Sequence, residues 1–203
     1  METTQQILTE SSRAASRGYS LPGRLSIFLG LATVGGVTDL WTKEVVFAWR
    51  GLPGMSSRWW LIEGHVGVET AVNIGALFGM GAGFGIFFAI ASIVAAIGIT
   101  AWLFLFHGAR SMWLTVAMGL VLGGIVGNLY DRLGIWHEPH MPVEWKSGVR
   151  DWILLTYGDY TWPNFNIADS LLVCGAGMLA WYSLTLKSTD ESIPVTRPPN
   201  SAD

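Results

Sequence analysis

The chain has 203 residues, of which 51% are hydrophobic and 13% are charged. An average soluble domain is about a quarter charged, so this composition argues against an ordinary water-soluble protein. The formal net charge is −3, and the charged residues are unevenly placed along the chain.

The N-terminal region combines a polar tail with a first apolar segment. Residues 1–23 are rich in Ser and Thr, and we expect a disordered tail. Residues 25–42 are apolar except for Asp39, with basic residues on both flanks. A cleaved secretory signal is the competing interpretation, but no small-residue cleavage motif follows. We therefore predict an uncleaved first transmembrane helix that ends near Lys43.

The segment that follows is polar and aromatic. Trp49, Trp59 and Trp60 suit the headgroup layer of a bilayer. Val and Ile punctuated by Gly at residues 60–78 are compatible with short strands on the membrane surface. We therefore expect a small β-containing region between the first two helices.

Three later segments contain no Lys, Arg, Asp or Glu. They are 24, 19 and 17 residues long and cover residues 83–106, 112–130 and 170–186. Crossing about 30 Å of hydrocarbon takes roughly 20 helical residues. A soluble core could explain one such segment, but three in so short a chain indicate a membrane protein.

The third predicted helix carries Gly119, Gly123 and Gly127 at intervals of four residues. Small residues at this spacing let helix backbones approach closely in lipid, so we assign them to packing. The short turn at residues 107–111 should make the second and third helices antiparallel neighbours.

The C-terminal part contains an outer loop and a fourth helix that should start near Asn166. The one cysteine of the chain, Cys174, falls in this helix and excludes an intrachain disulfide. Residues 188–203 should be a second disordered tail, which leaves residues 24–187 as the folded domain. Four spans place both termini on one side, but six basic residues on each side leave the orientation open.

Ionisable side chains at the ends of membrane spans are functional candidates, because they are costly there. Asp39 and Lys43 share one helix face, where an interfacial ion pair is the simpler explanation. Asn73 and Gly75 could simply form a turn before the second helix.

Two further clusters occupy the ends of the third and fourth helices. Asn128, Asp131 and Arg132 share a face, and a structural Asp–Arg pair is the simplest role for Asp131. Arg132 could in addition bind lipid phosphate or peptide carbonyl oxygens. Asn166 as a helix N-cap and Asp169 as a first-turn acid need no catalytic role. The motif Gly148-Val-Arg-Asp151 has no such structural explanation.

In this order, the five motifs resemble the motif series of the bacterial lipoprotein signal peptidases (signal peptidase II), over about residues 25–187. The resemblance implies that Asp151 and Asp169, here called the aspartyl pair, are catalytic. It implies supporting or substrate-binding roles for seven more residues: Asp39, Lys43, Asn73, Gly75, Asn128, Arg132 and Asn166.

The resemblance also implies a fold, a location and partners. We expect an all-α membrane protein of four transmembrane helices, with a small extracytoplasmic β-containing region between helices 1 and 2. Both termini should be cytoplasmic, and the site should face the outer side of the bacterial cytoplasmic (inner) membrane. The implied partners are membrane lipid and prolipoproteins, cleaved just before a diacylglyceryl-modified cysteine. We expect a monomer with no nucleic-acid partner, no cofactor and no metal.

The loop between Arg132 and Gly148 is longer than the family pattern. It contains His137, His140 and Glu144, but two His and a Glu in a loop lack a clear metal-ligand geometry. We therefore expect a surface loop.

Two carboxyl groups can hydrolyse a peptide bond if they share one proton, because close like charges cannot both ionise easily. Which one is protonated at rest stays open, since such a pair titrates as a unit. A small transporter or proton-relay protein is one alternative, because intramembrane charges also mark ion pathways. An inactive lipopeptide-binding scaffold of the same fold is the other.

Overall fold

The computed structural model describes residues 20–75 and 83–190. Residues 1–19 and 191–203, which form most of the two predicted tails, and the motif residues 76–78 lie outside the described residues. The main elements in chain order are α2 (Leu21–Arg50), β1 (Trp59–Ile62), β2 (Val66–Asn73), α3 (Gly85–Leu105), α4 (Met112–Arg132), β3 (Val149–Tyr157), β4 (Tyr160–Phe165) and α5 (Ile167–Asp190), with short 3-10 helices at Gly108–Arg110 and Val143–Trp145.

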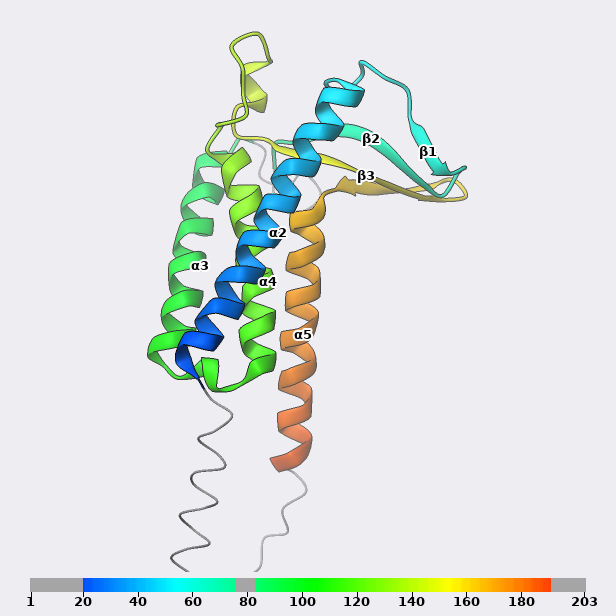
Figure 1. Cartoon of the computed structure of the whole chain (residues 1–203). Coiled ribbons are helices and arrows are strands. Elements are labelled where there is room, and N and C mark those ends of the chain that lie inside the picture. The colour runs from blue at the N-terminus through cyan, green and yellow to red at the C-terminus, as the bar shows by residue number, and fades with distance from the viewer. Residues whose placement is uncertain (1–19, 76–82, 191–203) are drawn as a thin grey trace, which may run out of the picture.

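Four helices, α2, α3, α4 and α5, are each long and apolar enough to cross a membrane. They form one bundle (Figure 1), and the predicted number of spans is confirmed. Large apolar side chains of α3, such as Phe87, Val94 and Leu105, are more than 60% exposed. A contiguous apolar surface of this kind marks a face that contacts lipid rather than water. The protein is therefore a multi-pass membrane protein.

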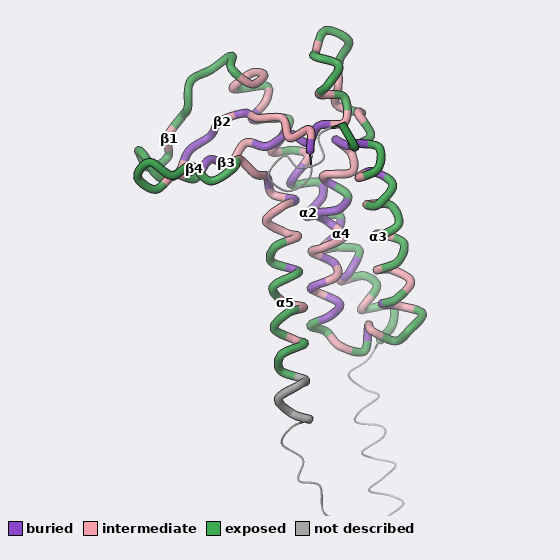
Figure 2. Tube along the Cα trace, turned by 180° about the vertical axis from the view of Figure 1, so that it is seen from behind, coloured by how far each residue is buried: buried purple, intermediate pink, exposed green. Residues whose placement is uncertain are grey.

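Helix α4 lies at the centre of the bundle and packs against α2, α3 and α5. Figure 2 shows buried residues concentrated along α4 and where the helices meet the sheet. A Cβ added to Gly123 would lie 3.2 Å from the carbonyl oxygen of Ala32 in α2. On the other side, a Cβ on Gly124 would lie 2.5 Å from the carbonyl oxygen of Ala168 in α5. Glycines therefore allow the close helix packing that the sequence predicts.

Helix α2 is longer than its apolar segment predicts. It begins at Leu21, where the Ser20 hydroxyl accepts a hydrogen bond from the Gly23 N–H, and it ends before Gly51, whose φ is 79°. The predicted end near Lys43 was therefore wrong, because hydropathy reports the part of a helix in hydrocarbon and not its continuation beyond it. Similarly, α5 continues to Asp190, so helix occupies residues 21–23 and 188–190.

A four-stranded antiparallel sheet lies at one end of the bundle, in the order β1-β2-β3-β4. It projects sideways beyond α5, and the N-terminal end of α2 and the C-terminal end of α5 lie at the opposite end of the bundle (Figure 1). Strand β2 pairs with β3, so that Ala71 lies opposite Asp151. The prediction of an all-α protein with strands only between the first two helices was incomplete, since half of the sheet follows α4. A two-stranded hairpin alone is marginally stable, and β3 and β4 complete the sheet.

The packing of α4 against α5 predicts a difference between two glycines. Gly124→Ala should lower the stability in detergent by about 1–3 kcal/mol, because its Cβ would meet Ala168 and Leu172. Gly98→Ala is the matched control, because a Cβ there meets nothing within 4 Å. It should leave stability unchanged or raise it by at most about 1 kcal/mol. Equal melting temperatures for the two variants would contradict this packing.

Candidate active site

Asn166 is the N-cap of α5, as the sequence predicts. Its Oδ1 accepts a hydrogen bond from the Asp169 N–H at 2.9 Å, and Asp169 Oδ2 accepts one from the Asn166 N–H at 3.2 Å. This reciprocal pattern is a capping box. The Nδ2 of the same side chain donates to Asp151 Oδ1 at 2.7 Å. One buried amide therefore contacts both members of the aspartyl pair.

The aspartyl pair lines a single cavity of about 1060 Å³. Asp151 reaches it from β3, and Asp169 reaches it from the first turn of α5. The cavity is bounded by α3, α4, α5 and the strands β2 to β4, and its walls include Asn73, Asn128 and Arg132 as well as the aspartyl pair. The structure thus brings together residues that lie on different elements.

Asp151 is almost completely buried, with 2% of its surface exposed. Burial raises the pKa of Asp151 well above its usual range, and the neighbouring charge of Asp169 raises it further. The charge of Lys43 and the hydrogen bond from Asn166 lower this pKa without cancelling the effect of burial. Asp151 therefore keeps its proton to a higher pH than an ordinary aspartate does.

Asn128 joins α4 to both α2 and α5. Its Nδ2 donates to Asp169 Oδ1 at 2.8 Å. Its Oδ1 accepts hydrogen bonds from Lys43 Nζ at 3.0 Å and from Asn166 Nδ2 at 3.1 Å. Both oxygens of Asp169 therefore accept hydrogen bonds from fixed donors, one on α4 and one at the start of α5.

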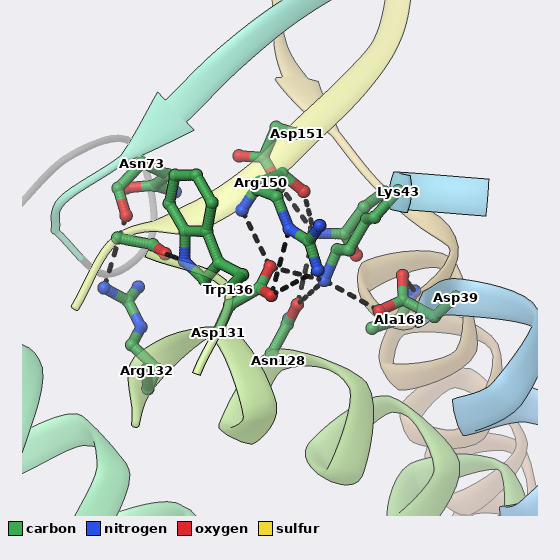
Figure 3. Close-up of polar contacts among 12 residues, drawn as sticks. Asp39, Lys43, Asn73, Asn128, Asp131, Arg132, Trp136, Arg150, Asp151 and Ala168 are labelled. Atoms are coloured by element: carbon green, nitrogen blue, oxygen red, sulfur yellow. Dashed lines mark hydrogen bonds and ion pairs between the residues drawn. The ribbon is translucent and has the colours of Figure 1, made fainter. Parts of the chain in front are cut away.

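A network of buried charges lies next to Asp151 (Figure 3). Lys43 Nζ lies 2.7 Å from Asp39 Oδ2 and 3.2 Å from Asp131 Oδ2, with all three side chains fully buried. Asp39 Oδ1 also accepts a hydrogen bond from the Ala168 N–H at 2.8 Å. The interfacial pair expected at Asp39 and Lys43 therefore exists, but it belongs to a buried network. Buried charges are stable only when paired in this way.

The sequence analysis missed Arg150, whose side chain is 3% exposed. Its guanidinium donates to Asp131 Oδ1 through Nε at 3.2 Å and Nη2 at 3.0 Å, and to Glu44 Oε2 at 2.9 Å. The rings of Trp136 and Phe47 lie 5.3 and 5.9 Å from it. The sequence feature that could have pointed to Arg150 is its place directly before Asp151 in a strand.

Arg132 is not the arginine partner of Asp131 that the simplest interpretation suggested, since Arg150 takes that place. Its Nη1 donates to the carbonyl oxygens of Asn73 at 3.2 Å and Ser147 at 2.9 Å. Its Nη2 donates to the carbonyl oxygen of Gly75. The guanidinium thus binds peptide carbonyls of its own chain and ties the end of β2 to α4. The predicted turn is present, since the Gly75 N–H donates to Asn73 Oδ1 at 3.1 Å.

The long loop at 133–147 stands beyond the end of α4 (Figure 1). Trp136 anchors it by donating to the Gly148 carbonyl oxygen at 3.0 Å. His140 pairs with Glu138 at 3.3 Å, and both side chains are more than 60% exposed. Within residues 20–75 and 83–190, no group of three or more His, Cys, Asp and Glu is arranged to hold a metal ion.

The burial of Arg150 predicts a large cost for removing its charge. Arg150→Met removes one of the two cations that neutralise the buried carboxylate of Asp131, so the free energy of unfolding in detergent should fall by about 3 kcal/mol. Arg58→Met is the control, because Arg58 pairs with Glu69 while 43% exposed. That change should cost about 1 kcal/mol or less. Similar losses of thermal stability in both variants would show that Arg150 does not anchor the network.

Comparison with known proteins gives three consistent matches. The profile of the family described as Signal peptidase (SPase) II matches residues 31–185. The Lipoprotein signal peptidase of Rhodopirellula baltica is 60% identical over 167 residues, which cover 81% of this chain and 75% of that protein. The Lipoprotein signal peptidase of Symbiobacterium thermophilum is 35% identical over 155 residues, covering 76% of this chain and 91% of that protein.

A solved structure described as a bacterial membrane enzyme is similar with a TM-score of 0.69, covering 88% of this chain and 97% of that chain. At 24% identity, this likeness shows the fold alone. The profile match spans most of the chain and includes the nine residues that the sequence analysis singled out. The chain therefore belongs to the signal peptidase II family, the lipoprotein signal peptidases.

Proposed function

We propose that the protein is an aspartyl endopeptidase that removes the signal peptide from diacylglyceryl-modified prolipoproteins and cleaves just before the lipidated cysteine. Membership of the family makes it a peptidase of lipoprotein precursors. The finer proposal assigns the chemistry to the aspartyl pair, Asp151 and Asp169. Its main support is Asn166, which hydrogen-bonds to both residues at the wall of one cavity.

The proposed reaction needs one water molecule and one shared proton. The water oxygen attacks the scissile carbonyl carbon, and Asp169 accepts a proton from that water molecule as it does so. Asp151, protonated because its pKa is raised, donates a hydrogen bond to the carbonyl oxygen. As the C–N bond breaks, Asp169 passes the proton that it took from the water to the leaving amine of the cysteine, so that Asp169 is ionised again and Asp151 keeps its own proton. The two products are a free carboxyl group and a free amine.

The shape of the cavity supports a substrate that stays partly in lipid. Its wall between α3 and α5 is built from small and apolar side chains, including Ala91, Ser92, Ala95, Val173 and Cys174. We propose that the signal peptide and acyl chains occupy this part, because apolar groups are most stable in hydrocarbon. The scissile bond can then reach the aspartyl pair at the sheet end of the bundle.

The proposed location is the bacterial cytoplasmic (inner) membrane, with the sheet end of the bundle toward its outer face. The N-terminal end of α2 and the C-terminal end of α5 lie at the other end (Figure 1), which is consistent with two cytoplasmic termini. All of the groups named above come from one chain, and we propose that the enzyme acts as a monomer. The proposed chemistry uses two carboxyl groups and water, without a cofactor.

Conservative replacement of either aspartate tests the proposal. Asp151→Asn and Asp169→Asn should each lower the cleavage rate at least about a hundredfold, because each removes one proton carrier. Asp159→Asn, in the exposed turn between β3 and β4, is the matched control and should retain normal turnover. The assay is conversion of a purified lipidated prolipoprotein by the enzyme in detergent, followed by gel mobility.

Thermal stability separates loss of chemistry from loss of fold. The raised pKa of Asp151 stabilises the protein at low pH, and this contribution is lost as the pH rises through that pKa. At neutral pH, Asp151→Asn should therefore be at least as stable as the parent protein. Near-normal turnover by either active-site variant would refute the assignment. Binding without cleavage by the parent protein would identify an inactive scaffold instead.

A further inference from the structure

The cavity does not end at the aspartyl pair but continues along the sheet. Ala71, opposite Asp151, lines it, and so do Leu155 and Trp162, which pair with each other in β3 and β4. Leu155 lies four residues beyond Asp151, or about 13 Å along an extended strand. The cavity thus has an apolar arm between α3 and α5 and a second arm under the sheet, here called the sheet arm.

The sheet arm contains a polar cluster on neighbouring strands. Glu69 of β2 and Asn164 of β4 both line the cavity. Asn164 Nδ2 donates to the Glu69 carbonyl oxygen at 2.7 Å and lies 3.5 Å from Glu69 Oε2. Apart from the aspartyl pair, Glu69 is the one acidic side chain among the described residues that line this cavity.

The charge of Glu69 is balanced from outside the cavity. Arg58 Nε donates to Glu69 Oε1 at 3.0 Å, and Arg58 is not part of the described cavity wall. Arg132 does line the cavity, but its guanidinium is already bonded to three backbone carbonyls. Among the described residues that line the cavity, Glu69 is therefore a carboxylate in the sheet arm, and the one cation, Arg132, is bound to carbonyls of its own chain.

The two arms differ in polarity, as do the two sides of the substrate. The signal peptide is apolar and suits the arm between α3 and α5, which leaves the sheet arm for the chain that follows the cysteine. We propose that Glu69 and Asn164 form a subsite for the first residues after the lipidated cysteine, and that this subsite favours basic or hydrogen-bond-donating side chains over acidic ones. This inference rests on the proposed function.

The size of the preference follows from the exposure of Glu69, which is 33% exposed. Solvent weakens interactions of partly exposed charges, so the discrimination should be modest, about threefold in kcat/KM. Asn164 Nδ2 is directed at Glu69, through a hydrogen bond of 2.7 Å to its carbonyl oxygen. We therefore assign the selectivity for charge to the Glu69 carboxylate. Asn164 positions the backbone of Glu69.

The test uses three lipidated prolipoproteins that differ only in the three residues after the cysteine, which are all Lys, all Ser or all Asp. Varying three positions together makes the result independent of which one lies beside Glu69. With the full-length enzyme in detergent, kcat/KM should be about threefold higher for the Lys substrate than for the Asp substrate. Glu69→Gln should bring this ratio close to one.

Two further variants control the result. Glu63→Gln removes an exposed carboxylate in the turn between β1 and β2, and it should keep the ratio of the parent protein. Arg58→Met removes the cation that balances Glu69, so the ratio should rise above that of the parent protein. An equal ratio in the parent protein, Glu69→Gln and Arg58→Met would overturn the subsite. Failure of the parent protein to cleave even the Ser substrate would instead refute the proposed function, and the subsite with it.

Discussion

The side chain of Asn166 is the point on which the site depends. Its Oδ1 satisfies the first turn of α5, and its Nδ2 reaches Asp151 on the neighbouring strand. Because a capping box fixes the residue three positions later, Asp169 is placed by the start of the helix itself. The side chain that begins α5 therefore also contacts Asp151, and it links the two members of the aspartyl pair.

The buried charges behind the pair explain how a strand and three helices keep one arrangement. Lys43 of α2 contacts Asp131 of α4, and Asp131 contacts Arg150 of β3. Isolated charges would be costly in the protein interior, whereas in this network Lys43 and Arg150 are each paired with carboxylates. Side chains locked by such partners hold a catalytic group in place more closely than a loop can. Arg150 adjoins Asp151 directly, so the network extends into the backbone of the candidate active site.

Much of this arrangement is predictable from sequence, because it rests on local patterns. Charge-free runs of about 20 residues predict the spans. The spacing of Asn166 and Asp169 predicts the cap. The roles of Arg150 and of the second half of the sheet could not be predicted in this way, since they depend on contacts between residues far apart in the chain, such as Glu44 with Arg150. Hydropathy also did not predict the full length of α2, because the last turns of this helix lie beyond the apolar segment.

The proposed mechanism requires the aspartyl pair to share one proton, with Asp151, whose pKa is raised by burial, as the member that carries it at rest. Infrared difference spectroscopy of the purified enzyme at neutral pH measures this directly, because protonated and ionised carboxyl groups absorb differently. Since burial raises the pKa of Asp151, the parent protein should show a protonated carboxyl band that is absent from Asp151→Asn and retained in Asp159→Asn. Identical spectra for the parent protein and Asp151→Asn in the protonated-carboxyl region would contradict the account.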